Sequence, residues 1–318
     1  MRIAAIITVF LFACAGAFAK SGISYADATA LGLVEGFTEF LPVSSTGHLL
    51  IANEFLELNS EEPLLDSKSK EIIDDSGASF TLRRAAEAYA IVIQIGAILA
   101  VALIYKAEIL QILAGILGRN PSGLKLAINI LVAFMPAAIL GVLFDKHIEE
   151  HLFGVKPIIV ALAAGAFLMF IMQKIYDKRI ACDGKFSTMS AMTPRQALLI
   201  GLLQCVAMWP GTSRSMMTIL GGYAAGLKPA DAAKFSFLLG LVTLSAASFY
   251  KAAQDGPATL ESISPMPLLV GIAVAFVSAA ISVKWLVGFL TRHGLAPFAW
   301  YRLFLAALLA AMLYFNFI

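Results

Sequence analysis

Long apolar stretches alternate with short polar loops along most of the chain. A membrane-spanning helix requires about 20 mostly apolar residues. Six stretches meet this requirement, although the last contains an arginine: about 88–105, 126–144, 155–173, 233–250, 266–290 and 299–317. The pattern therefore predicts an all-α integral membrane protein with about six transmembrane helices.

Two further apolar regions, about 24–56 and 197–226, are interrupted by Pro42 and Pro210 and by clusters of Ser, Thr and Gly. Each apolar piece is too short to cross a bilayer, which predicts a re-entrant helical hairpin that enters and leaves by the same face. Irregular backbone at membrane depth is tolerated only where it is buried in protein or lines a wet cavity. The two breaks are therefore expected to form the walls of a site.

The charges of the loops predict a topology. With residue 20 outside, most cations of the short loops fall in the cytoplasm, while the outer loops, including a polar loop of about 57–87, lean acidic. The first hairpin then enters from outside and the second from inside, and three spans follow each. This arrangement is an inverted repeat within one membrane domain of residues 20–318, with repeats of about 24–144 and 197–290.

A short sequence match supports the repeat. The segment Pro42-Val43-Ser44-Ser45 can be aligned with Pro210-Gly211-Thr212-Ser213, which makes Ser45 and Ser213 equivalent. At the N-terminus, residues 1–19 combine a basic residue, an apolar run and a small-x-small ending, as a signal peptide does. For this segment a cleaved signal and an extra N-terminal helix are both open.

Composition agrees with lipid as the solvent. The chain is 60% hydrophobic and 14% charged, whereas soluble domains are about 45–50% apolar and about 25% charged. The net charge of +2 and the lack of basic clusters argue against a nucleic-acid partner. The three cysteines form no CxxC or Cys/His spacing, so neither a disulfide framework nor a zinc site is supported.

The first broken region carries a pair of carboxylates. Glu35 and Glu39 are four residues apart and share one helix face. Two adjacent carboxylates in a low dielectric repel each other, and they persist where a cation binds them or a proton is shared. A hard divalent cation such as Mg²⁺, shared with a phosphate substrate, is a natural partner.

Hydroxyls and a histidine follow this pair. Ser44, Ser45 and Thr46 offer hydroxyls and free backbone N–H groups at the start of a helix, which is an anion site. His48 lies one turn further and is expected to act as a general base or acid. Because ionisable residues inside a membrane are functional by default, a purely structural cap is the weaker interpretation.

The second broken region, Pro210–Thr218, is positively charged. Arg214 has a planar fork that suits phosphate or carboxylate oxygens, and it is expected either to bind phosphate or to neutralise the carboxylates of the first region. Ser213, Ser215 and Thr218 add neutral donors.

Two polar residues within spans leave alternatives open. Arg302 is either a second phosphate ligand or a side chain that reaches the interface, and Gln94 is either a ligand or a helix–helix hydrogen bond. Together, the arginines, hydroxyls and carboxylates indicate a lipid-borne phosphate or pyrophosphate with a metal.

These motifs resemble the undecaprenyl-diphosphatase family, also called the bacitracin-resistance proteins. The family pattern of Glu or Gln, three residues and Glu is met by Glu35 and Glu39, and the pattern PGxSRSxxT is met from Pro210 to Thr218. The resemblance covers most of the chain after about residue 24. Further agreement lies in Glu39–His48, Val92–Gly96, Phe235–Leu239 and Pro297–Arg302.

The resemblance implies hydrolysis of undecaprenyl diphosphate to undecaprenyl phosphate and inorganic phosphate, which recycles the lipid carrier for peptidoglycan synthesis. It also implies a divalent cation, Mg²⁺ or Ca²⁺, held by Glu35 and Glu39, and a multi-pass protein of the bacterial cytoplasmic (inner) membrane with its site open to the periplasm. The oligomeric state stays open, with a homodimer as one alternative. The resemblance makes Glu39, His48 and Arg214 central, with a supporting set of Glu35, Ser45, Ser213, Thr218 and Arg302. With the motifs themselves, the expected catalytic residues are Glu39, Ser45, His48 and Arg214. The expected substrate-binding residues are Ser44, Thr46, Gln94, Ser213, Ser215, Thr218 and Arg302.

The nucleophile stays open between Ser45 activated by His48 and a water activated by His48 or Glu39. A rival function is a lipid-phosphate flippase, because inverted repeats with broken helices are also a transporter architecture. A histidine beside serine and a carboxylate pair favours bond cleavage.

Overall fold

The computed structural model describes residues 22–64, 70–73, 77, 79–182, 184–262 and 264–318, and the signal-like segment 1–19 lies outside them. All regular elements of this part of the chain are helices. In chain order they are α2 (Tyr25–Thr38), α3 (Ser45–Phe55), α4 (Leu82–Ile104), α5 (Lys106–Ile116), α6 (Pro121–Leu152), α7 (Val155–Ala181), α8 (Pro194–Val206), α9 (Arg214–Ala224), α10 (Pro229–Ser262), α11 (Pro265–His293) and α12 (Ala296–Tyr314).

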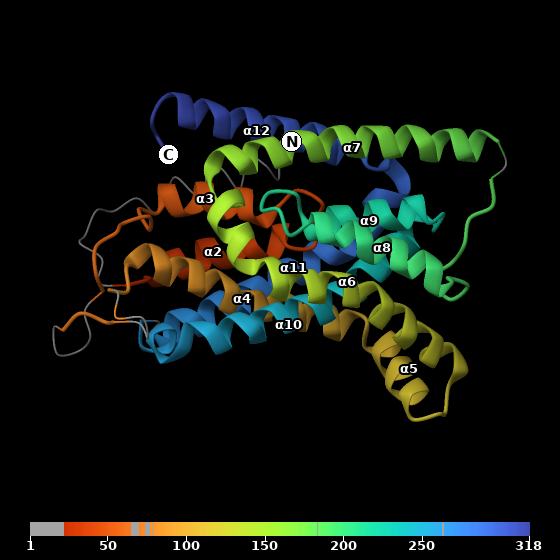
Figure 1. Cartoon of the computed structure of the whole chain (residues 1–318), viewed down its shortest axis with the longest axis horizontal. Coiled ribbons are helices and arrows are strands. Elements are labelled where there is room, and N and C mark those ends of the chain that lie inside the picture. Colours follow the sequence, from red (N-terminus) through yellow and green to blue (C-terminus); the bar gives the residue numbers. More distant parts are fainter. Residues whose placement is uncertain (1–21, 65–69, 74–76, 78, 183, 263) are drawn as a thin grey trace.

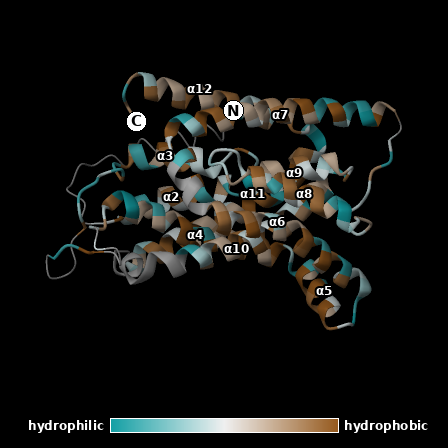
Figure 2. Cartoon of the chain, viewed as in Figure 1, coloured by the Kyte–Doolittle hydropathy of each residue, from teal (hydrophilic) through white to brown (hydrophobic). Residues whose placement is uncertain are grey.

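Six of the described helices are long and apolar enough to cross a membrane: α4, α6, α7, α10, α11 and α12. They cover the six predicted spans, so the prediction of an all-α, multi-pass membrane protein is confirmed. Apolar residues run along these helices (Figure 2), and large apolar side chains such as Leu143 and Phe304 are 68% and 64% exposed. An apolar surface of this extent is typical of a protein that faces lipid.

The first span begins earlier than the hydropathy indicated. α4 starts at Leu82, so the polar loop predicted over about 57–87 ends at Thr81. The side chain of Thr81 caps the helix by accepting a hydrogen bond from the backbone of Arg84. The first turn carries charged residues, including Arg83, which pairs with Glu61 at 2.9 Å. These charges lower the local hydropathy and hide the start of the helix from the sequence pattern.

Both predicted breaks are present. α2 and α3 have 14 and 11 residues, and α8 and α9 have 13 and 11, so none reaches the roughly 20 residues of a span. α8 and α9 are antiparallel, because Gln196 donates to the carbonyl of Ala225 and Ile200 packs against Gly221. The structure thus contains helix–break–helix units, while their re-entry through one membrane face stays a prediction.

The two units begin at matching caps. Ser24 before α2 and Thr193 before α8 each form a capping box with the side chain three residues later. Ser44 and Ser213 are the N-caps of α3 and α9, and each has a φ of 75°, which L-residues adopt rarely. The same number of residues separates the two caps in each unit. The units are therefore internal repeats of one local structure.

This cap geometry corrects the predicted alignment of the repeats. Ser213 matches Ser44 in backbone conformation, and not Ser45. Ser213 follows Pro210 by three positions, whereas Ser44 follows Pro42 by two. Ser45 is consequently equivalent to Arg214, so the two repeats place different chemistry at the first residue of the second helix.

Packing follows the same repeat. α2 packs on α11 and α8 packs on α6, each through a glycine: a Cβ at Gly32 would lie 2.7 Å from the carbonyl oxygen of Gly271, and one at Gly201 2.3 Å from that of Ala133. α4 also packs against α10, and α7 against α12, as Figure 1 shows for the latter pair. These contacts agree with two repeats, whose boundaries and opposite membrane entry stay predictions.

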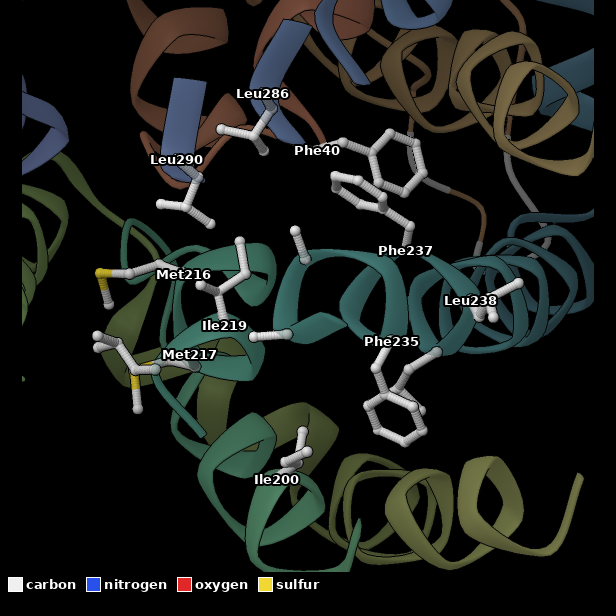
Figure 3. Close-up of a cluster of buried hydrophobic side chains, with 14 of the residues drawn as sticks. Phe40, Ile200, Met216, Met217, Ile219, Phe235, Phe237, Leu238, Leu286 and Leu290 are labelled. Carbon is white, nitrogen blue, oxygen red and sulfur yellow. The ribbon is translucent and has the colours of Figure 1, made fainter. Parts of the chain in front are cut away.

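The largest apolar cluster of the described residues joins the first break to α8, α9, α10 and α11 (Figure 3). Phe40, from the first break, meets Phe237 of α10 edge to face, with ring centroids 5.7 Å apart. The same cluster contains Met216 of α9 and Leu286 and Leu290 of α11. Phe40 of the first break and Met216 near the start of α9 are therefore anchored in one core.

Candidate active site

A cavity of about 190 Å³ lies between the two breaks. Residues of both breaks line it, together with one residue each from α4 and α10. The lining residues are Glu39, Ser44, Ser45, Thr46, Gln94, Ala207, Pro210, Gly211, Ser213, Arg214 and Leu244. The structure therefore brings the two predicted motifs together, although they are far apart in the sequence.

Glu39 joins the two motifs. Its Oε2 accepts a hydrogen bond from the hydroxyl of Ser45 at 2.8 Å. Its Oε1 forms an ion pair with Nη2 of Arg214 at 3.2 Å, and both side chains are at least 90% buried. A buried charge without a partner is strongly unfavourable, so Glu39 and Arg214 hold each other in place at the cavity wall.

Arg214 is fixed from behind by α10. Its Nη1 donates to the carbonyl of Ser236 at 3.1 Å, and its guanidinium lies over the ring of Phe40, 5.2 Å from the centroid. A Cβ at Gly240 would collide with Nη1, so glycine is needed there for the guanidinium to fit. The fork is thus oriented in advance for an anion in the cavity.

Glu35 lies one turn before Glu39 and is 2% exposed. It accepts a hydrogen bond from Nε2 of Gln94 at 3.2 Å, and Ser248 donates to the same amide at 3.5 Å. Among the residues that the structure describes, no group of three His, Cys, Asp or Glu is placed to hold a metal. Two buried carboxylates beside hydroxyls nevertheless fit a hard divalent cation that takes its other ligands from water or phosphate.

The three hydroxyls of the second motif have different positions. Ser213 lines the cavity. Ser215 is fully buried and donates to the carbonyl of Leu41 at 2.7 Å, which ties the second break to the first. Thr218 is also fully buried and lies 2.6 Å from the hydroxyl of Ser236. Only Ser213 of these three is therefore open to a ligand in the cavity.

His48 turns away from Ser45. Its Nδ1 lies 2.7 Å from the carbonyl oxygen of Ser44, and its Nε2 lies 2.7 Å from the hydroxyl of Tyr301. Because a carbonyl only accepts, Nδ1 carries the proton and Nε2 accepts from Tyr301. The expected Ser45–His48 contact is not formed in this structure, and the group that accepts the hydrogen bond of the Ser45 hydroxyl is the carboxylate of Glu39.

Arg302 does not line the cavity. It is fully buried and donates to the carbonyls of Ala161 and Leu162 in α7 and to that of Gly211 in the second break, at 3.0, 3.3 and 3.0 Å. A Cβ at Gly165 would clash with its guanidinium. Arg302 thus acts as a clamp that holds the second break against α7.

Sequence reasoning gave no role to Tyr301 or Ser236. Both lie in segments that agree with the family, and the signal in the sequence is a polar side chain inside an apolar helix. Tyr301 and Arg302 are adjacent on α12, yet one supports the first break and the other the second. α12 therefore holds the two breaks in register.

Residues 28–308 match the model of a known family, described as bacitracin resistance protein BacA. This chain belongs to that family. It is 41% identical to the undecaprenyl-diphosphatase of Sorangium cellulosum over 89% of this chain and 84% of that protein. It is 39% identical to undecaprenyl-diphosphatase 2 of Rhodospirillum rubrum, over 87% and 90%, and 38% identical to the undecaprenyl-diphosphatase of Acinetobacter baumannii, over 90% and 95%.

In this member of the bacitracin-resistance family, one side of the cavity is acidic and the other is basic. The carboxylate of Glu39 lies at the end of α2, and the guanidinium of Arg214 lies at the start of α9. The N-termini of α3 and α9 begin at the cavity, where backbone N–H groups favour anions. Such a site can bind phosphoryl oxygens, stabilise charge that develops on them, and accept a proton from a nearby hydroxyl.

Proposed function

We propose that the chain hydrolyses undecaprenyl diphosphate to undecaprenyl phosphate and inorganic phosphate. The observation that carries this proposal is the contact of Glu39 with both Ser45 and Arg214 in a cavity between two breaks. The relatives at 38–41% identity bear the name undecaprenyl-diphosphatase. The reaction returns the lipid carrier to peptidoglycan synthesis, and its loss would sensitise cells to bacitracin.

The geometry favours Ser45 as the nucleophile and Glu39 as its base. Glu39 takes the proton of Ser45, whose Oγ attacks the distal phosphorus, and the bond to the bridging oxygen breaks so that undecaprenyl phosphate leaves. Arg214 stabilises the charge on the phosphoryl oxygens. Water then attacks the phosphorus of the phosphoserine, and the bond to Oγ breaks. The proton held by Glu39 returns to Oγ, and phosphate leaves with both hydrogens of the water. A water activated by Glu39 would give the same products, and then Ser45→Ala would retain substantial activity.

Glu35 and Glu39 would hold a divalent cation, Mg²⁺ or Ca²⁺. When bound, the cation neutralises phosphate charge that the single Arg214 does not balance. Gln94 orients Glu35 by a hydrogen bond. Glu35→Gln is expected to weaken Mg²⁺ binding more than it lowers the rate at saturating Mg²⁺, which a metal titration of phosphate release measures.

The charge bias of the loops supports a place in the bacterial cytoplasmic membrane, with the cavity open to the periplasm. In that orientation the enzyme meets the carrier where polymer synthesis releases it. Cysteine labelling from each side of the membrane, at Ser60 in the loop before α4 and at Ser190 before α8, tests the orientation.

The decisive experiment uses detergent-solubilised protein, undecaprenyl diphosphate and Mg²⁺, with free phosphate as the readout. Wild-type protein is expected to release phosphate without any sealed compartment, and Ser45→Ala to lose nearly all of this activity. Wild-type protein that releases no phosphate would contradict the proposal.

A flippase is the second candidate, and the internal repeat of broken helices favours it. Lipid-phosphate flux in liposomes, combined with no hydrolysis in detergent, would select this function over the hydrolase.

A further inference from the structure

The geometry points to a second, apolar site beside the cavity: a groove between α6 and the second break that binds the first isoprene units of the substrate's prenyl tail. This inference rests on the proposed function. The groove has a volume of about 550 Å³. Its lining residues are Leu140, Phe144, Ile148, His151, Leu152, Cys205, Val206, Met208 and Trp209.

The groove and the cavity share one wall. Met208 and Trp209 of the second break line the groove, whereas Ala207 and Pro210 of the same segment line the cavity. Neighbouring residues of a single segment thus face the two spaces. A molecule with its phosphates in the cavity and its tail passing this short segment would place its first tail carbons in the groove.

The lining fits a hydrocarbon chain. It is formed almost entirely by aliphatic, sulfur-containing and aromatic side chains, and Phe144 and Val206 are 49% and 44% exposed on its open side. The tail can therefore enter sideways from the bilayer. Adjacency to a site for phosphates favours the tail of a lipid diphosphate over the acyl chain of a bulk phospholipid.

The groove is expected to act by orientation. A prenyl tail gains little hydrophobic free energy when it moves from lipid into an apolar groove, because lipid is equally apolar. Packing of the first units does, however, fix the bridging oxygen relative to Ser45, and orientation of this kind lowers a barrier. Sites of about 300–1,000 Å³ enclose drug-sized molecules, so the groove holds a short part of the tail and not all of it.

Chain-length dependence tests this inference. Phosphate release is measured for a series of prenyl diphosphates of increasing length, at fixed detergent, with wild-type protein and with Leu140→Trp and Val206→Trp, which fill the groove. In wild-type protein kcat/KM is expected to rise over the first isoprene units and then level off. In the filled variants the ratio of kcat/KM for long and short tails falls about tenfold, since changes in an apolar pocket have effects of this size.

Leu143→Trp is the matched control, because Leu143 lies on the same helix, is 68% exposed and does not line the groove. It is expected to keep the wild-type ratio. If a filled variant aggregates in size-exclusion chromatography, Phe144→Ala replaces it, and loss of the ring is expected to lower the same ratio. A ratio that stays at the wild-type value in soluble groove variants, while phosphate is still released, overturns the groove and leaves the proposed function standing. Failure of wild-type protein on every prenyl diphosphate would instead overturn the proposed function.

Discussion

The two helix–break–helix units share a backbone and differ in charge. Both begin with a capping box, both pack through a glycine on a long helix, and both enter their second helix through a serine with a φ of 75°. At the first residue of that second helix, however, one unit has Ser45 and the other has Arg214. The repeat supplies two equal scaffolds, and the cavity between them uses one for acid and hydroxyl groups and the other for a cation.

The buried carboxylates show why the units had to diverge. The residue equivalent to Glu35 is Gln204, which is 2% exposed and accepts a hydrogen bond from Thr243 at 3.3 Å. Gln204 thus keeps the position and a polar contact but has no charge. Two acidic units would place like charges around one small cavity, which is strongly unfavourable in a low dielectric. Divergence of the side chains on a shared backbone therefore gives the cavity one acidic and one basic side.

The largest expected effect comes from deleting the charge of the second unit. Arg214→Ala should lower kcat for phosphate release at least about a thousandfold, which is the range for an arginine that stabilises phosphoryl transfer. It also leaves Glu39 buried without its partner. Steady-state kinetics on purified protein measures the effect.

Arg214→Lys is the matched control. It keeps the charge but loses the planar fork, so an intermediate rate is expected. Near-normal turnover of well-folded Arg214→Ala protein would remove Arg214 from catalysis and leave it as a structural partner of the carboxylate.

A second prediction concerns the support of the first unit. If His48 holds the carbonyl of Ser44 through Nδ1–H, then His48→Asn, whose amide N–H lies near the position of Nδ1, should retain about tenfold more activity than His48→Gln. This hydrogen bond joins two neutral groups and stabilises the N-cap of α3. Loss of an N-cap contact usually lowers stability by about 1 kcal/mol. Initial rates with purified variants give the comparison. Equal and near-complete loss in both variants would favour His48 as the base.

The sequence predicted the six spans and both breaks because these depend on local apolar length and on proline. It left open whether Arg214 binds phosphate or neutralises one of the two carboxylates, and the structure shows an ion pair with Glu39. It failed on the register of the repeat, because the two prolines on which the alignment rested are not equivalent: Pro42 precedes its N-cap, Ser44, by two positions, and Pro210 precedes Ser213 by three. Backbone conformation is set by tertiary packing around the break, and no pattern of residue types shows it.

The directions of side chains were also beyond the sequence. His48 lies three residues from Ser45, which suggested a contact, but the ring is drawn to Tyr301 on a helix more than 250 residues away. Arg302 was expected at phosphate or at the interface, and it instead binds backbone carbonyls of α7 and the second break. Long-range hydrogen bonds decide both cases, and they become visible only when α12 is placed.

The clamp on the second unit gives the third prediction. Arg302→Met keeps the length of the side chain but removes the hydrogen bonds that a charged group donates to three buried carbonyls, and each such bond contributes roughly 1.5–3 kcal/mol. The thermal midpoint in detergent should fall by several degrees, and phosphate release should fall about tenfold because Gly211 lines the cavity.

Arg292→Met, on the exposed end of α11, is the control for loss of a cation. A large rise in KM for Arg302→Met without a change in thermal midpoint would contradict the clamp and support direct phosphate binding.

The smallest expected effects test whether the units are equivalent in packing. Gly201→Ala places a Cβ 2.3 Å from a backbone carbonyl of α6, and Gly32→Ala places one 2.7 Å from that of α11. Overpacking usually destabilises by about 1–3 kcal/mol, so both variants should have lower thermal midpoints, with Gly201→Ala the more affected. Gly288→Ala is the control, because no atom lies within 4 Å of its added Cβ.

Lower thermal midpoints in both variants, with an unchanged control, would show that both units depend on these close helix contacts, even where their charges have diverged. A loss in only one variant would mean that only that unit depends on close packing.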